Sequence, residues 1–402
     1  MPDNRRNLAI LFFTMVVVMM GFGMVIPILP FYIIQFGAGG SAMGLLMATY
    51  AVMQFIFSPI WGGISDRIGR KPVLMIGVLG NAIAQILFGF STELWMLIAA
   101  RVIAGVLSSA TLPTAMAYIG DSTAEKDRGG GMGIIGAAMG VGMVLGPGIA
   151  GWMATYSLSA PFFLAAGLSL LALVFILLTL PESLPLDKRT LSGTRISGPQ
   201  LRELWQALFS PIGFLLILAF LVSFGLTNFE SVFGLYANAQ YDYGPQQVGW
   251  LLTFIGLISA IVQGGLTGPF TRRWGEATVI KISLFGSAVG FALMTLADSI
   301  FTVLLTTGFF VISNAMLRPA VSALISKRAT IGQGVAMGLN NASMSLGRSV
   351  GPLWAGFIYD LNLVYPYWSG AVIMLVGFVF SLFKLKSEPA VQIEGSQSQV
   401  AD

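Results

Sequence analysis

The sequence predicts an all-α membrane protein with twelve transmembrane helices, arranged as two six-helix pseudo-repeats. Composition is the first reason: of the 402 residues, 56% are apolar and only 9% are charged, and the mean hydropathy is +0.83. A soluble domain averages about 45–50% apolar and about 25% charged residues. The other two reasons are the apolar runs that recur along the chain and a glycine-rich motif that occurs twice.

Twelve apolar runs are long enough to cross a bilayer, which takes about 20 predominantly apolar residues. The first run is too long for a signal-peptide core and lacks a clear small-residue cleavage site, so we expect it to remain as a helix. The predicted helices cover approximately residues 8–34, 43–64, 73–91, 94–118, 130–152, 161–180, 211–237, 247–268, 278–297, 300–325, 334–357 and 366–384.

Basic residues predict the orientation of these helices. If the N-terminus faces the cytoplasm, all but three of the 21 Lys and Arg fall in cytoplasmic segments, and the exceptions, Arg101, Arg318 and Arg348, lie within helices. Membrane proteins show this excess of basic residues on their cytoplasmic side. We therefore expect both termini in the cytoplasm, and a net charge of +4 that reflects topology rather than nucleic-acid binding.

The chain contains neither cysteine nor histidine. Disulfide and thiol chemistry and the usual zinc and haem ligands are therefore excluded. We expect no metal and no cofactor, and any proton transfer must use carboxylates.

Internal repetition divides the chain into halves. Gly142–Gly151 reads G-x-x-x-G-P-x-x-A-G, and Gly347–Gly356 reads the same 205 positions later. The simplest interpretation is six helices followed by six helices. We expect an N-terminal bundle at residues 1–180, a cytoplasmic linker at 181–210, a C-terminal bundle at 211–386 and a disordered tail at 387–402.

A short helix is predicted near the end of the linker. In Leu201–Leu208, helical spacing places Leu201, Leu204, Trp205 and Leu208 on one face. This pattern is typical of a helix on the inner membrane surface. A plain solvated linker is the alternative.

The densest charge cluster is Gly62–Pro72, between the second and third apolar runs. It reads G-x-x-x-D-R-x-G-R-K and resembles the loop between the second and third helices of the major facilitator superfamily. The resemblance implies two bundles with a transport site between them, and a latch that holds the halves in the outward-open state. We expect Asp66, Arg70 and Asp121 to form this latch; a loop that only sets topology is the plainer alternative.

A second copy of this cluster is incomplete. Gly62-Gly63 and Arg70-Lys71 recur as Gly264-Gly265 and Arg272-Arg273, 202 positions later, but Gly268 stands where Asp66 would lie. The sequence therefore predicts a one-sided latch.

The duplicated glycine motif predicts close helix packing. Gly142, Gly146, Pro147 and Gly151 would let two helix backbones approach closely, and Pro147 removes one backbone donor and permits a bend. In the resembled superfamily this motif is typical of exporters. Mere close packing is the alternative.

Four ionisable residues lie well inside predicted helices: Arg101, Glu230, Arg318 and Arg348. Placing one there costs about 2.5–3.5 kcal/mol on insertion scales, so each is a candidate functional residue. A desolvated carboxyl such as Glu230 can alternate between neutral and charged forms near physiological pH. Glu230 is thus the candidate for proton coupling and for attracting a cationic substrate; an ion pair with Arg318 is the structural alternative.

The sequence indicates the roles of the three arginines less specifically than that of Glu230. The resemblance links Arg101 to proton transfer, and its expected neighbour is Gln54 of the second helix. Arg318 could line the cavity, whereas Arg348 is expected to be a structural tie to backbone carbonyls. Helical spacing adds further candidates for substrate contact: Tyr50, Gln54, Phe233, Asn340 and Met344.

Within the superfamily, the chain resembles the twelve-helix drug:proton antiporter branch, and NorA/Bmr-type multidrug pumps in particular. Asn228–Ser231 and Leu317–Ala320 look like their seventh and tenth helices. In those pumps the seventh-helix acid, here Glu230, couples protons and recognises cationic drugs. Their tenth helix also carries an acid, whereas this chain has Asn314–Met316 there. One acid alone predicts electroneutral exchange of one proton for one monocation.

These observations predict a monomeric, proton-coupled transporter in a bacterial plasma membrane that exports lipophilic, often cationic drugs by alternating access. Export or import of one specific metabolite or lipid is the main alternative. A non-transporting receptor would leave Glu230 and the latch unexplained. An enzyme is disfavoured because no set of nucleophile and base, and no metal site, is recognisable.

Overall fold

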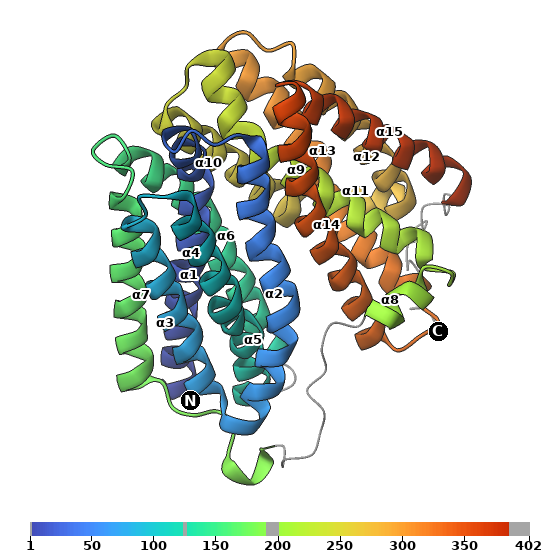
Figure 1. Cartoon of the computed structure of the whole chain (residues 1–402). Coiled ribbons are helices and arrows are strands. Elements are labelled where there is room, and N and C mark those ends of the chain that lie inside the picture. Colours follow the sequence, from blue (N-terminus) through green and yellow to red (C-terminus); the bar gives the residue numbers. More distant parts are fainter. Residues whose placement is uncertain (1, 124–126, 190–200, 386–402) are drawn as a thin grey trace, which may run out of the picture.

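A computed structural model describes residues 2–123, 127–189 and 201–385, and all regular elements within these ranges are helical (Figure 1). A helix satisfies its own backbone hydrogen bonds, which a segment in lipid cannot do with water. In the first half the elements are α1 (Pro2–Gln35), α2 (Gly40–Ile68), α3 (Arg70–Gly89), α4 (Leu94–Leu107), η1 (Ser108–Ala110), α5 (Thr111–Ser122), α6 (Arg128–Met153) and α7 (Ala160–Thr179).

The second half repeats this order after a short 3₁₀ turn, η3 (Leu186–Lys188), and a short helix, α8 (Leu201–Ala207). In each half, one span is continuous but locally distorted: α4 passes through η1 into α5, and α10 passes through a π turn, η4, into α11. The elements of the second half are α9 (Gly213–Tyr241), α10 (Pro245–Ile261), η4 (Val262–Leu266), α11 (Thr267–Trp274), α12 (Glu276–Met294), α13 (Ile300–Arg328), α14 (Gln333–Leu361) and α15 (Tyr365–Lys384).

Twelve helical spans therefore lie in the described residues, as the apolar runs predict. Eleven are apolar enough to cross a membrane by composition alone. The twelfth, α14, is more polar, and it packs between α9 of its own half and α2 of the other half. Because protein covers two of its sides, α14 can hold asparagines and an arginine that a lipid-facing helix could not.

The two halves meet along two seams, α2 with α14 and α6 with α10. We call the end with the α1–α2 and α14–α15 connections the sealed end, because both seams lie there. The opposite end, which carries Arg67, Arg70, Arg128 and Arg328, is called the basic end. Figure 1 shows the halves touching at the sealed end and diverging toward the basic end.

The duplicated glycine motif builds these seams with the same plan in each half. In α6, a methyl group added at Gly146 would lie 2.7 Å from the Met20 carbonyl oxygen of α1, in the same half. One added at Gly151 would lie 2.7 Å from the Pro245 carbonyl oxygen of α10, in the other half. The first part of the motif therefore packs a helix within its half, and the last glycine packs it across the halves.

The second copy follows the same division. Gly351 faces α9 of its own half, where an added methyl group would lie 2.8 Å from the Phe224 carbonyl oxygen, whereas Gly356 faces Gly40 and Gly44 of α2. Close backbone approach between small residues is a recurrent way of packing membrane helices. It occurs in this chain at two positions related by the internal repeat.

Toward the basic end the same helices have no such neighbours. Added methyl groups at Gly133, Gly136 and Gly140 of α6, or at Gly264 and Gly265 of the α10–α11 span, would meet no described atom within 4 Å. The seams therefore end part-way along the helices, and the halves are separate beyond that point.

The predicted linker helix is present as α8. The residues expected to share one face of this helix differ in burial. Leu204 is buried together with Ala207, and α8 packs near α14, whereas Trp205 is 65% exposed and its ring lies 5.8 Å from that of Phe209. Residues 190–200 of the predicted linker and the tail at 387–402 lie outside the described residues.

Candidate functional site

Glu230 lies on the face of α9 that is turned toward the junction of the halves. On one side of it along the helix, the Thr227 hydroxyl lies 3.4 Å from the Gly347 carbonyl oxygen of α14. On the other side, Gly234 packs against Pro30 of α1, in the other half. The Glu230 side chain is half-buried and makes no hydrogen bond or ion pair with any residue that the structure describes.

The ion pair with Arg318 that would have neutralised Glu230 is not formed. Arg318 projects from α13 with an exposed side chain, and within the described ranges no acid pairs with it. Glu230 is therefore an acidic group between the halves that lacks a fixed counter-charge.

Arg101 is enclosed within the first half, with 1% of its surface exposed. Its Nη2 donates to the Met47 sulfur at 3.0 Å, and its guanidinium carbon lies 5.6 Å from the ring centres of both Tyr50 and Phe88. The expected neighbour, Gln54, instead points its amide at the Tyr50 hydroxyl, at 3.4 Å. Arg101 thus rests on aromatic faces and a thioether instead of the expected amide.

Arg348 is half-buried on α14, and its Nη2 donates to the Ser345 hydroxyl at 2.8 Å. The expected tie to backbone carbonyls is therefore replaced by a bond to a side chain of the same helix. This bond leaves the positive charge of Arg348 without a counter-charge in the described residues.

The predicted substrate contacts fall into two groups. Tyr50 and Gln54 are half-buried on α2, and the Tyr50 ring lies beside the Arg101 guanidinium. Phe233, Asn340 and Met344 are buried inside the second half instead. For Asn340 the reason is clear, because its amide donates to the Ser322 hydroxyl of α13 at 3.1 Å.

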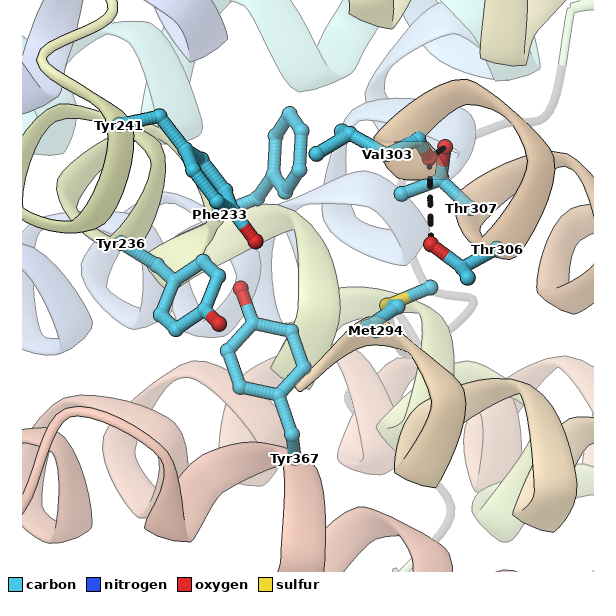
Figure 2. A pocket seen from close by; sticks show the side chains of 8 residues that line it. All are labelled: Phe233, Tyr236, Tyr241, Met294, Val303, Thr306, Thr307 and Tyr367. Atoms are coloured by element: carbon cyan, nitrogen blue, oxygen red, sulfur yellow. Dashed lines mark hydrogen bonds between the residues drawn. The ribbon is translucent and has the colours of Figure 1, made fainter. Parts of the chain in front are cut away.

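Phe233 lines a small pocket that sequence reasoning missed (Figure 2). Figure 2 shows the hydroxyl groups of Tyr236, Tyr241 and Tyr367 turned toward one another there. Tyr241 donates to the Ala297 carbonyl oxygen at 2.9 Å, whereas the buried Tyr367 hydroxyl has no partner in the described residues. The space suits about one water molecule, which makes this a packing pocket and not a substrate cavity.

The cluster at Asp66, Arg70 and Asp121 is assembled at the basic end of the first half. The Arg70 guanidinium contacts Asp66 at 2.6 Å and Asp121 at 2.8 Å, so the expected ion pair with Asp121 is present. Glu182, which sequence reasoning missed, accepts from the backbone N–H of Arg70 at 2.8 Å and caps the start of α3. All four residues belong to the first half or its connection, so here they bridge helices of one half.

The second half carries a counterpart of this cluster with the charges reversed. Gly69 and Gly275 share a left-handed turn, with φ of 109° and 74°, and so mark equivalent positions 206 residues apart. At the same offset, Arg70 corresponds to Glu276 and Asp121 to Lys327, and Glu276 and Lys327 form an ion pair at 2.6 Å.

This equivalence corrects the register expected from sequence. Arg272-Arg273 had been matched to Arg70-Lys71, but the turn glycines align Arg272 with Asp66 and Arg273 with Arg67. The turn glycines are 206 residues apart, four more than the offset expected from sequence, and the span that contains the π turn is one residue longer than α2. The two halves therefore differ at the Asp66 position, where the second half carries Arg272. They agree in having an ion pair between helices, Arg70 with Asp121 in the first half and Glu276 with Lys327 in the second.

A further contact across the halves closes the sealed end. The Asp360 carboxylate, near the end of α14, accepts from the backbone N–H groups of Gly40 at 2.6 Å and Ser41 at 2.8 Å, and from the Ser41 hydroxyl. An anion at a helix N-terminus is stabilised by the free N–H groups and the helix dipole. No sequence signal marks Asp360, because its partners are more than 300 residues away.

Twelve spans in two similar halves, with an unpaired acid and arginines between or beside them, define a multi-pass secondary transporter. A model of the Major Facilitator Superfamily matches residues 11–262 and again residues 215–400, and the chain belongs to that family. Members of this superfamily bind and move small molecules, which places the chain among transporters and not among enzymes.

Several multidrug and quinolone resistance proteins are similar over nearly the whole chain. Multidrug resistance protein 1 of Bacillus subtilis is 33% identical over 95% of this chain and 97% of its own length. Multidrug resistance protein 2 of the same organism is 31% identical, over 93% and 94%. Quinolone resistance protein NorA of Staphylococcus aureus is 30% identical, over 94% and 97%.

Solved structures share the fold at lower identity. A variant of the nucleoside transporter NupG superposes with a TM-score of 0.81 at 16% identity, covering 94% of this chain and all of that one. The human organic anion transporter MFSD10 gives a TM-score of 0.66 at 23% identity, with coverage of 95% and 100%.

Proposed function

We propose that this chain is a proton-coupled antiporter that exports lipophilic, often cationic compounds by alternating access. The relatives named above for multidrug and quinolone resistance support drug export, and proton coupling is general to this branch of the superfamily. The observation that carries the proposal is the position of Glu230, half-buried between the halves and without a fixed partner in the described residues.

An acidic group in this position suits exchange of a proton for a cation. A carboxylate held by an arginine would stay ionised, whereas one in a half-buried site without a counter-charge can gain and lose a proton. The same oxygens would bind either a proton or a cationic substrate, so the two compete. Competition for one site is the simplest physical basis of antiport.

The halves are the moving units in this proposal. We infer that the basic end faces the cytoplasm of a bacterial cell, because basic residues collect there. The sealed end would then face outward, and the structure would represent the inward-facing state. Asp66, Arg70 and Asp121 are the proposed latch: they are held together within the first half, ready to engage the second half when the basic end closes. Both seams lie within one chain, which supports a monomer as the working unit.

Ethidium transport in energised inside-out vesicles tests the proposal. We expect proton-driven ethidium accumulation by the wild type and its loss in Glu230→Gln, because an amide cannot release a proton. Glu93→Gln is the matched control, since Glu93 lies in the α3–α4 connection and bonds the Trp95 indole. Unchanged accumulation in Glu230→Gln would remove Glu230 from the mechanism.

A further inference from the structure

The residues that touch along each seam define how its two helices are aligned lengthwise. α6 and α10 run in opposite directions, and a methyl group added at Gly256 would lie 3.4 Å from the Val144 Cγ2. Because both helices rise by about 1.5 Å per residue, equal numbers of residues counted from this contact toward the basic end remain level. Arg272 follows Gly256 by 16 residues, and Arg128 precedes Val144 by 16. The π turn changes this count by about one residue, so Arg272 is level with the first turn of α6, whose N-cap residue is Asp127.

The α2–α14 seam has the same alignment. Gly44 lies against the Pro352 carbonyl oxygen. Asp66 follows Gly44 by 22 residues, and Thr330 precedes Pro352 by the same number. Asp66 is therefore level with the start of α14, whose N-cap residue is Gly332. In both seams, the residue at the Asp66 position is level with the N-terminus of a helix in the other half.

The starts of these two helices differ in charge, each in the sense that matches the residue level with it. Gly332 has no side chain, so the free N–H groups at the start of α14 attract an anion, and the residue level with them is Asp66. At the start of α6 the N-cap residue is itself an acid, Asp127, and the residue level with it is Arg272. The exchange of an acid for a base on α11 is thus accompanied by an added acid on α6.

Arg272 and Asp127 are both exposed, and neither is committed to a partner within its own half in the described residues. The Asp127 side chain makes no cap hydrogen bond with its own helix. In the first half, the acid at the position of Arg272 pairs with Arg70 one turn later, at 2.6 Å. The equivalent partner of Arg272 would be Glu276, but Glu276 pairs with Lys327 instead. Both side chains can therefore engage a residue of the other half.

Glycines occupy level positions between the seam and these two charged residues. Gly264 follows Gly256 by eight residues, and Gly136 precedes Val144 by eight. A methyl group added at Gly136 or Gly264 would meet no described atom within 4 Å. Close approach at glycines already packs α6 against α10 at the sealed end. Closing the basic end would extend that seam as far as the charged residues.

We propose that Arg272 and Asp127 form an ion pair across the halves when the basic end closes. The pair is a second latch, of opposite polarity to the contact of Asp66 with the start of α14. Its attraction acts only while the two ends are close, so it stabilises the outward-facing state. The proposal rests on the alternating access proposed above and assigns a contact to the seam that lacks the Asp66 acid.

Disulfide trapping on the other seam measures how often the basic end closes. Ile68→Cys and Ile331→Cys are introduced together into the full-length, cysteine-free chain, at exposed positions near the end of α2 and the start of α14. The protein is reconstituted in liposomes and oxidised with copper phenanthroline, and the rate of cross-linking is recorded. Neither cysteine replaces a residue of the proposed pair. A complete lack of cross-linking would show that the basic end does not close, and would overturn the latch.

Charge exchange tests the pair itself. We expect Arg272→Asp and Asp127→Arg each to slow cross-linking about fivefold, a moderate effect because solvent screens exposed ion pairs. The double exchange restores opposite charges and should return the rate to within twofold of the wild type. Arg273→Asp is the matched control, because it makes the same charge change at an exposed position about 100° further around the helix. We expect it to change the rate less than twofold.

Three outcomes of this exchange would overturn the proposal. The first is a double variant that cross-links more slowly than either single variant, and the second is an equal slowing by Arg273→Asp. The third is faster cross-linking in Arg272→Asp, which would show that Arg272 meets Arg128 and not Asp127. Ethidium accumulation by the wild type is measured separately: proton-driven accumulation with cross-linking that ignores Arg272 would refute the latch alone, whereas loss of accumulation would refute the export function.

Discussion

Gly151→Ala should open the sealed end of this transporter without unfolding either half. The added methyl group would lie 2.7 Å from the Pro245 carbonyl oxygen, 3.0 Å from the Gly249 Cα and 3.2 Å from the Gln246 Cα. All three atoms belong to the backbone of α10 in the other half. No side chain can rotate away to relieve the contact, so α6 and α10 must separate.

The size of the effect follows from these distances. Ordinary contacts to a methyl carbon are about 3.5 Å, so the seam must widen by roughly 0.5–1 Å. Overpacking of this kind costs about 1–3 kcal/mol. Because the cost applies only while the seam is closed, the equilibrium between closed and open sealed ends should shift by roughly 5- to 150-fold.

Spin-label distances measure this shift directly, and the chain offers a cysteine-free background for labelling. One pair of cysteines at Thr92 and Leu361 reports on the sealed end, and a second pair at Asp127 and Ile331 reports on the basic end. All four positions are exposed. In Gly151→Ala we expect the first distance to lengthen and the second to shorten.

Gly146→Ala is the matched control, because its methyl group would also lie 2.7 Å from a carbonyl oxygen, that of Met20. Met20 lies in the same half, so this variant should lower the melting temperature and leave the distances unchanged. Gly167→Ala, on the exposed face of α7, should change neither. The reasoning is refuted if Gly146→Ala and Gly151→Ala shift the distances equally, or if neither does.

Two further predictions concern the charged contacts. Glu276→Lys and Lys327→Glu should each lower thermal stability by up to about 1 kcal/mol, since Lys327 is 58% exposed and solvent screens the pair; the double exchange should recover most of the loss, and strictly additive losses would show that the pair is not coupled. Asp360→Asn removes the charge at the α2 N-terminus and should favour the open sealed end by about 0.5–2 kcal/mol in the same spin-label assay. Asp298→Asn is its control, because Asp298 bonds only Thr302 of its own half in the described residues. An equal shift of the spin-label distances in both variants would contradict the prediction.

The fold could be predicted almost completely from the sequence, because a helix that crosses a lipid bilayer must be apolar over about 20 residues. Twelve runs near 20 residues leave few alternatives, and the repeated glycine motif fixes the internal symmetry. Even α14 was recognised, although its composition alone does not mark it as a span. The predicted helix ends fall short of the observed ones, as at α1, because helices continue beyond the apolar core into water.

Contacts between distant segments were harder to predict. The pairing of Arg70 with Asp121 was expected from a motif, but the Glu276–Lys327 pair was hidden because its charges are exchanged and its offset is 206 residues instead of the expected 202. Periodicity places Phe233 and Asn340 on plausible faces, yet it cannot distinguish a face toward the other half from one toward α13. Asp360 had no local signal, because its role depends on how the halves meet.

The two seams of the sealed end do not have equal strength. The α2–α14 seam carries the Asp360 cap, whereas the matching position in the first half is Thr155, just after the end of α6, whose hydroxyl donates to the Trp152 carbonyl oxygen of α6. No hydrogen bond joins α6 to α10 in the described residues, so we expect that seam to part first, with α2–α14 acting as the pivot. Cargo would then leave through a lateral gap flanked by α6 and α10. With the basic end inside, as proposed above, that exit would lead a lipophilic compound into the outer leaflet of the bilayer before it reaches water.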